Sequence, residues 1–74
     1  MKEITIQRIA KDYAKRAFGK DFVSILYLGK DKGAEGFNIY EFKLFLKTGE
    51  FYFNVLEIQK GSKRELLYDL TPKE

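Results

Sequence analysis

Residues 40–53 read YEFKLFLKTGEFYF, a run in which apolar and polar side chains largely alternate on either side of a Thr-Gly pair. Alternation with a period of two indicates a strand, and two such runs joined by two turn-forming residues indicate a β-hairpin. A two-residue turn at Thr48-Gly49 gives this hairpin one apolar face. The expected opposite pairs on that face are Leu46 with Phe51, Leu44 with Phe53, and Phe42 with Val55.

A third strand continues this hairpin on its C-terminal side. A two-residue turn at Gly61-Ser62 is expected to join residues 50–59 to residues 63–70. This second turn extends the same apolar face, because it places Val55 opposite Tyr68 and Phe53 opposite Leu70. The predicted inner face consists of Phe42, Leu44, Leu46, Phe51, Phe53, Val55, Leu66, Tyr68 and Leu70.

A fourth strand and a helix precede the hairpin. Residues 22–28 are short, β-branched and aromatic, which is typical of a strand, and the glycine-rich residues 29–36 follow as a loop. Residues 3–18 are predicted to form an amphipathic helix that ends at Gly19, because apolar side chains recur there every three or four positions. Its apolar stripe is Ile6, Ile9, Ala10, Tyr13, Ala14 and Ala17.

The predicted architecture is a single α+β domain over residues 1–74, with one N-terminal amphipathic helix packed on a four-stranded antiparallel meander (αββββ) and residues 71–74 as a frayed tail. An alternative is αβββα. In that reading Ser62-Lys63-Arg64-Glu65 is a capping box that opens a C-terminal helix through Leu66, Leu67 and Leu70 and ends before Pro72.

A second apolar face is left on the other side of the predicted sheet, with Ile39 opposite Ile58, Phe45 opposite Tyr52, and Leu56 opposite Leu67. One helix covers only one side of a sheet, and monomeric proteins rarely expose a contiguous apolar patch larger than a few hundred Å². We therefore predict a non-enzymatic protein–protein interaction module, most simply a homodimer. The alternative to an interface is a purely structural role, in which these side chains only stabilise cross-strand pairs. The expected partner-binding residues are Ile39, Phe45, Tyr52, Leu56, Ile58 and Leu67.

Nucleic-acid binding is the alternative function. The chain carries 14 Lys and Arg against 11 Asp and Glu, a net charge of +3, and basic residues are concentrated in the predicted helix. Such a face can neutralise phosphates, while Phe45 and Tyr52 could stack on unpaired bases. Asp12 is expected to pair with Arg8 or Arg16 and to compensate part of this charge. The expected nucleic-acid contacts are Arg8, Lys11, Lys15, Arg16, Lys43 and Lys63.

Enzymatic function is not expected. The chain has no Cys and no His, which removes thiolate nucleophiles, disulfides, zinc–thiolate sites and the usual general base. We expect no catalytic residue, no metal and no cofactor. Glu57 is predicted to turn inward near Tyr40 in a structural role. No apolar run is long enough to span a membrane, and Met1-Lys2-Glu3 leads into an amphipathic segment, so we expect a cytoplasmic protein.

One amphipathic helix followed by an antiparallel meander that contains residues 40–53 resembles small cystatin-like domains, PepSY-type modules among them. The resemblance covers most of the chain and implies a role in binding or inhibition. Residues 28–37 do not match the protease-blocking Q-x-V-x-G hairpin of cystatins, and the chain has no Trp for their second loop. The resemblance therefore implies binding instead of protease inhibition.

Overall fold

The computed structural model describes residues 2–33 and 36–72. One helix is followed by four strands that form a single antiparallel sheet in the order β1-β2-β3-β4, which confirms the αββββ prediction. The helix ends at Gly19, as expected, where φ is 52°. The elements are α1 (Glu3–Phe18), the 3₁₀ turn η1 (Gly19–Asp21), β1 (Phe22–Lys32), β2 (Phe37–Leu46), β3 (Gly49–Lys60) and β4 (Lys63–Pro72).

The αβββα alternative is wrong, because β4 pairs with β3 along its whole length, from Lys63 opposite Lys60 to Pro72 opposite Phe51. A capping-box pattern is a local signal, and it is outweighed here by a ladder of ten residues that packs Leu66 and Tyr68 against the core. Thr71 and Pro72 belong to this ladder, so the prediction of a frayed tail is wrong for these two residues. Residues 73–74 lie outside the described residues.

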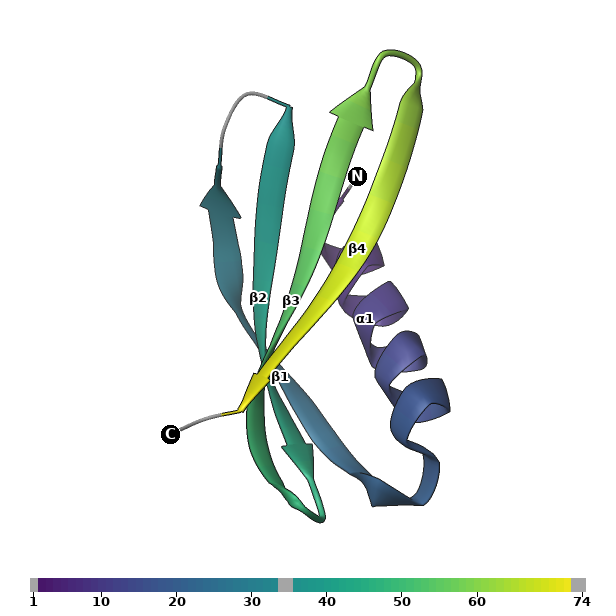
Figure 1. Cartoon of the computed structure of the whole chain (residues 1–74), viewed down its shortest axis with the longest axis vertical. Helices are drawn as coiled ribbons and strands as arrows, with labels where there is room; N and C mark the ends of the chain where they lie inside the picture. Colours follow the sequence, from purple (N-terminus) through teal and green to yellow (C-terminus); the bar gives the residue numbers. More distant parts are fainter. Residues whose placement is uncertain (1, 34–35, 73–74) are drawn as a thin grey trace.

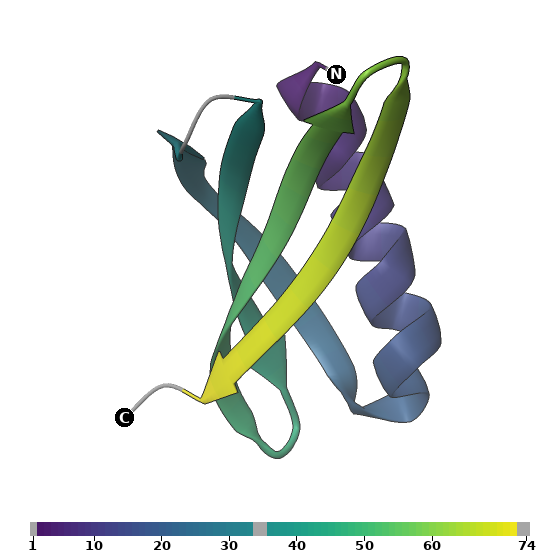
Figure 2. The ribbon, with the colours of Figure 1, turned by 45° about the horizontal axis from the view of Figure 1, so that its top comes forward.

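The helix covers one face of a twisted sheet, and no other described helix or strand lies over the opposite face (Figure 1, Figure 2). Small side chains let the helix approach closely, since Ala10 and Ala14 are fully buried together with Ile6. Tyr13 stacks on Tyr68, with ring centroids 3.9 Å apart, and closes the β4 side of the core. The sheet contributes Tyr40, Phe42, Leu44, Leu46, Phe53 and Val55 to the buried core.

The β2–β3 register differs from the prediction by two residues. Lys47 and Thr48 form the turn, and the observed pairs are Leu46 with Gly49, Leu44 with Phe51 and Phe42 with Phe53. Gly49 was expected inside the turn, but it is the first residue of β3. Its φ of 145° is a backbone conformation that favours glycine. A shift of two positions leaves every side chain on its predicted face. The β3–β4 pairs Val55–Tyr68 and Phe53–Leu70 are confirmed.

Strand β1 is longer than predicted, since it continues to Lys32 and pairs Gly29 with Glu41 and Lys32 with Asn38. The expected loop at residues 29–36 is therefore wrong for residues 29–32, while residues 34–35 lie outside the described residues. The prediction that Leu70 belongs to the core is also wrong, because 40% of this residue is exposed. It lies near the end of the edge strand β4, which there diverges from the helix (Figure 1, Figure 2).

Candidate interaction surface

The face of the sheet turned away from α1, here called the outer face, carries all six residues that the sequence predicted as partner contacts. The register aligns Ile39, Leu56 and Leu67 in one row across β2, β3 and β4, so the predicted Leu56–Leu67 pair is confirmed. The predicted Ile39–Ile58 and Phe45–Tyr52 pairs are wrong by the same two-residue shift. Ile58 lies opposite Phe37, and Phe45 lies opposite Glu50.

Half-exposed apolar side chains define this face. Tyr52 is 39% exposed and Leu67 is 49% exposed, while Ile39, Phe45, Leu56 and Ile58 are intermediate. An antiparallel sheet commonly leaves one face open to solvent, but the residues of that face are then normally polar. Within residues 2–33 and 36–72, no helix or strand provides one (Figure 2).

Two leucines of β1, which the sequence analysis did not include, enlarge the outer face. Leu26 is 52% exposed and lies opposite Lys43, and Leu28 is 48% exposed. Leu28 lines a hollow of about 350 Å³ together with Tyr52 of β3 and Thr71 of β4. The apolar surface therefore extends over all four strands. The apolar run at residues 25–28 indicates a strand. It does not show which of its residues face outward, because two register shifts interrupt the alternation of β1.

The structure does not bring together the six residues predicted to contact nucleic acid. Arg8, Lys11, Lys15 and Arg16 are exposed on α1, whereas Lys43 lies on the outer face and Lys63 at the start of β4. The Lys43 ammonium forms an ion pair with Glu50 at 3.3 Å and lies 5.5 Å from the centre of the Phe45 ring. Its charge is thus compensated beside the aromatic side chains that were expected to stack on bases.

Asp12 was expected to pair with Arg8 or Arg16, and this prediction is wrong. Among the described residues the ion pairs are Lys43–Glu50, Lys60–Glu65 and Arg64–Glu57, with no Asp12 pair. An exposed pair four residues apart on a helix stabilises it by only about 0.3–0.5 kcal/mol, so little stability is lost when the pair does not form. The basic side of α1 therefore keeps its positive charge.

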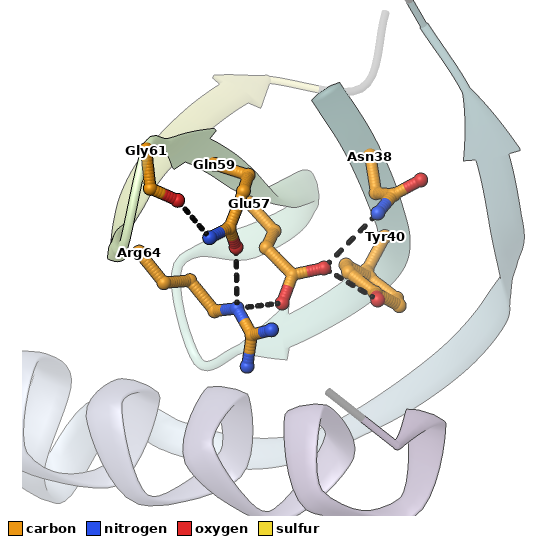
Figure 3. Close-up of polar contacts among 6 residues, drawn as sticks. All are labelled: Asn38, Tyr40, Glu57, Gln59, Gly61 and Arg64. Carbon is orange, nitrogen blue, oxygen red and sulfur yellow. Dashed lines mark hydrogen bonds and ion pairs between the residues drawn. The ribbon is translucent and has the colours of Figure 1, made fainter. Parts of the chain in front are cut away.

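Glu57 is the one charged side chain among the described residues that is buried, at 4% exposure, and it faces the helix side of the sheet. The Asn38 amide and the Tyr40 hydroxyl each donate a hydrogen bond of 3.1 Å to Glu57 Oε1, and Arg64 Nε lies 3.2 Å from Glu57 Oε2 (Figure 3). This confirms the predicted proximity of Glu57 to Tyr40.

These contacts hold the carboxylate in its charged form. Burial alone raises the pKa of Glu57, but hydrogen bonds from Asn38 and Tyr40 are among the contributions that lower it, and the net pKa lies below the ordinary value. Burial, and next the hydrogen bond to Glu57, raises the pKa of Tyr40 to about 12. At neutral pH Glu57 is therefore ionised and Tyr40 is protonated, and the two side chains are hydrogen-bonded to each other on the helix side of the sheet.

The described residues offer neither a metal site nor a helix that could span a membrane. No group of three or more His, Cys, Asp or Glu side chains in residues 2–33 and 36–72 is arranged to hold a metal ion. No helix in the described part of the chain has the length and apolar character needed to cross a bilayer.

Comparisons of the chain with protein-family models, with curated proteins and with solved structures found no match. The resemblance to cystatin-like domains stays a prediction.

Proposed function

We propose that this protein is a non-enzymatic interaction module that self-associates through the outer face of its sheet. The observation that carries the proposal is the cluster of half-exposed apolar side chains on a face that no described element covers. Leu26, Leu28, Tyr52 and Leu67 are each 39–52% exposed there. Removing such surface from water is favourable by about 25 cal/mol per Å² of apolar area.

The extents of the molecule leave room on one face for a dimer interface of standard size. The molecule measures 39 × 24 × 17 Å, so each face of its sheet is broad relative to its thickness. A standard interface removes about 800 Å² from each partner, which is roughly a sixth of the 5136 Å² of accessible surface. A two-fold dimer uses the same patch on both subunits, so one apolar face is sufficient for both halves of the interface.

One pair of charges on this face is already compensated, while the exposed carboxylates Glu41 and Asp69 lie on it on either side of Asn54 and must stay solvated or find a partner in a dimer. Lys43 and Glu50 already form an ion pair with each other, so covering them removes less favourable hydration than covering two isolated charges. The apolar row of Ile39, Leu56 and Leu67 lies between this pair and the β3–β4 turn. A partner copy that contacts the row through its own row makes a self-complementary interface.

Sedimentation over a range of protein concentrations tests this proposal. We expect a monomer–dimer equilibrium that persists at high salt, because it rests on apolar burial. Leu26→Lys and Leu67→Lys place a charge at opposite edges of the outer face and should each weaken association at least tenfold. Ile4→Lys is the matched control, because Ile4 is 67% exposed but lies on the helix; it should leave the equilibrium unchanged.

Two outcomes would contradict the proposal. One is a monomer at every concentration. The other is association that only generic RNA induces and that high salt abolishes, since counterion release makes nucleic-acid binding steeply salt dependent. The second outcome would favour the nucleic-acid alternative and would depend on the basic residues of α1.

A further inference from the structure

A second surface of the molecule combines exposed apolar side chains with uncompensated charge. Elements α1 and β1 leave the Gly19–Asp21 turn together and then diverge (Figure 1, Figure 2), and residues of both elements line a groove. Two hollows of about 440 and 410 Å³ lie along it and share Lys11 and Ile25 as lining residues. Because they share these residues, we treat them as one continuous feature, the α1–β1 groove.

Apolar side chains from both elements line the groove along its length. Ile4 and Val23 line it at opposite ends, and they are 67% and 57% exposed, the two highest values among the exposed large hydrophobic residues. Ile25 and the ring of Tyr27 lie between them on β1. The outer face does not account for these side chains, because they lie on the helix side of the sheet or at its β1 edge.

The helix side of the groove is basic. Arg8, Lys11 and Lys15 line it at intervals of three and four residues, so they follow one stripe of α1. Within the described residues none of the three forms an ion pair with a carboxylate. The stripe thus offers three cations to a ligand that is apolar on its other side.

The groove also has a direction. Ile4, Tyr27 and Phe42, together with Arg8, line only the hollow farther from the Gly19–Asp21 turn, and Lys15 lines only the nearer one. The longer apolar stretch therefore lies toward Ile4, and Lys11 and Lys15 lie together at the other end. From Ile4 to Lys15 the helix rises by roughly 16 Å, which is the length available to an extended chain.

We propose that the α1–β1 groove binds a long-chain carboxylate as a single molecule, with the carboxylate at Lys11 and Lys15 and the hydrocarbon chain along Ile25 and Tyr27 toward Ile4. The volume is in the range of small-molecule sites, roughly 300–1,000 Å³. The apolar side chains contribute affinity through burial, and the basic stripe sets the orientation and the charge preference of the ligand. This site is independent of the outer face.

Titration calorimetry with monomeric decanoate, combined with amide chemical shifts, tests the proposal. The expected result is saturable binding, with shifts concentrated in residues 4–15 and 23–27. The double variant Lys11→Gln/Lys15→Gln should weaken binding at least fivefold, and Ile4→Asn should weaken it about threefold, in line with exposed apolar and charged contacts. The charge-matched control is Lys60→Gln/Lys63→Gln at the β3–β4 turn, which should bind as the wild type does.

Three results would overturn the proposal. Decyltrimethylammonium has the same chain with a positive head, and binding as tight as that of decanoate would show that the basic stripe has no role. Loss of binding in Leu67→Lys but not in Lys11→Gln/Lys15→Gln would place the amphiphile on the outer face. Binding to anionic phospholipid vesicles without binding to monomeric decanoate would identify a membrane surface as the ligand.

Discussion

Glu57 illustrates, at the scale of a single residue, how this small core tolerates a buried charge. An ionised carboxylate without partners inside a protein costs several kcal/mol and normally takes up a proton. Here two hydrogen-bond donors reach one oxygen, and Arg64, on the neighbouring strand, reaches the other (Figure 3). The cluster connects β2, β3 and β4 near the β3–β4 turn. It therefore links three strands through side-chain contacts at the end of the sheet beyond the apolar core.

Replacement of Tyr40 by Phe tests this role through pH. The hydroxyl is buried and its pKa is raised from 10.0 to about 12, so the stability that it contributes is fully present below pH 10 and is lost as the pH rises toward 12. Tyr40→Phe should cost about 1–3 kcal/mol at neutral pH and should remove that part of the alkaline loss. Urea unfolding of both proteins between pH 7 and 12 measures the difference.

The dependence of stability on pH in the acid range should also change in Tyr40→Phe. The pKa of Glu57 is lowered in the folded state, so its contribution is present above the ordinary value of 4.5 and disappears as the pH falls through the folded value. Without the Tyr40 donor the folded pKa of Glu57 moves back toward 4.5, so the loss of stability between pH 4.5 and lower pH should become smaller. The exposed Tyr52→Phe serves as the control. Parallel stability curves for the wild type and Tyr40→Phe would show that the Tyr40–Glu57 contact has no energetic role.

The helix depends on small residues where it crosses the sheet. Ala14 is fully buried, whereas Ala17, one turn later, is exposed, although both belong to the predicted apolar stripe. Ala14→Leu should therefore destabilise the fold by about 1–3 kcal/mol through overpacking, and Ala17→Leu should change stability by less than about 0.5 kcal/mol. Denaturant unfolding of the two variants measures this contrast, and an equal effect of both substitutions would refute the close packing of α1.

The strands show which features of an element could be predicted and which could not. The faces of β2, β3 and β4 followed from alternation alone, and they survived a register error of two residues because side-chain direction repeats every two positions. Strand β1 breaks that rule, since its pairing with β2 shifts between Phe22 and Ser24 and again between Tyr27 and Gly29. Each shift inserts one unpaired residue, which reverses the alternation. Leu28 on the outer face and Val23 in the α1–β1 groove are these two inserted residues.

At the scale of the molecule, a single helix on a four-stranded sheet leaves apolar side chains exposed in two places. Six of the seven exposed large hydrophobic side chains of the described chain lie in the outer face or in the α1–β1 groove, and Leu70 is the seventh. The outer face could be predicted because it follows from counting layers. The groove could not, because it depends on the angle between α1 and β1, which no sequence pattern specifies.

Self-association through the outer face should make the thermal stability of the whole molecule depend on its concentration. A dimer forms from folded chains only, so mass action raises the unfolding midpoint as the concentration increases above the dissociation constant. For a domain of this size 1 kcal/mol corresponds to about 4–8 °C, so the midpoint should rise by a few degrees for each tenfold increase. Leu26→Lys should shift the rise of the midpoint to concentrations at least tenfold higher, and Ile4→Lys should follow the wild type. Calorimetry from micromolar to millimolar protein decides the matter, because a constant midpoint in the wild type would leave the outer face without a second copy to cover it.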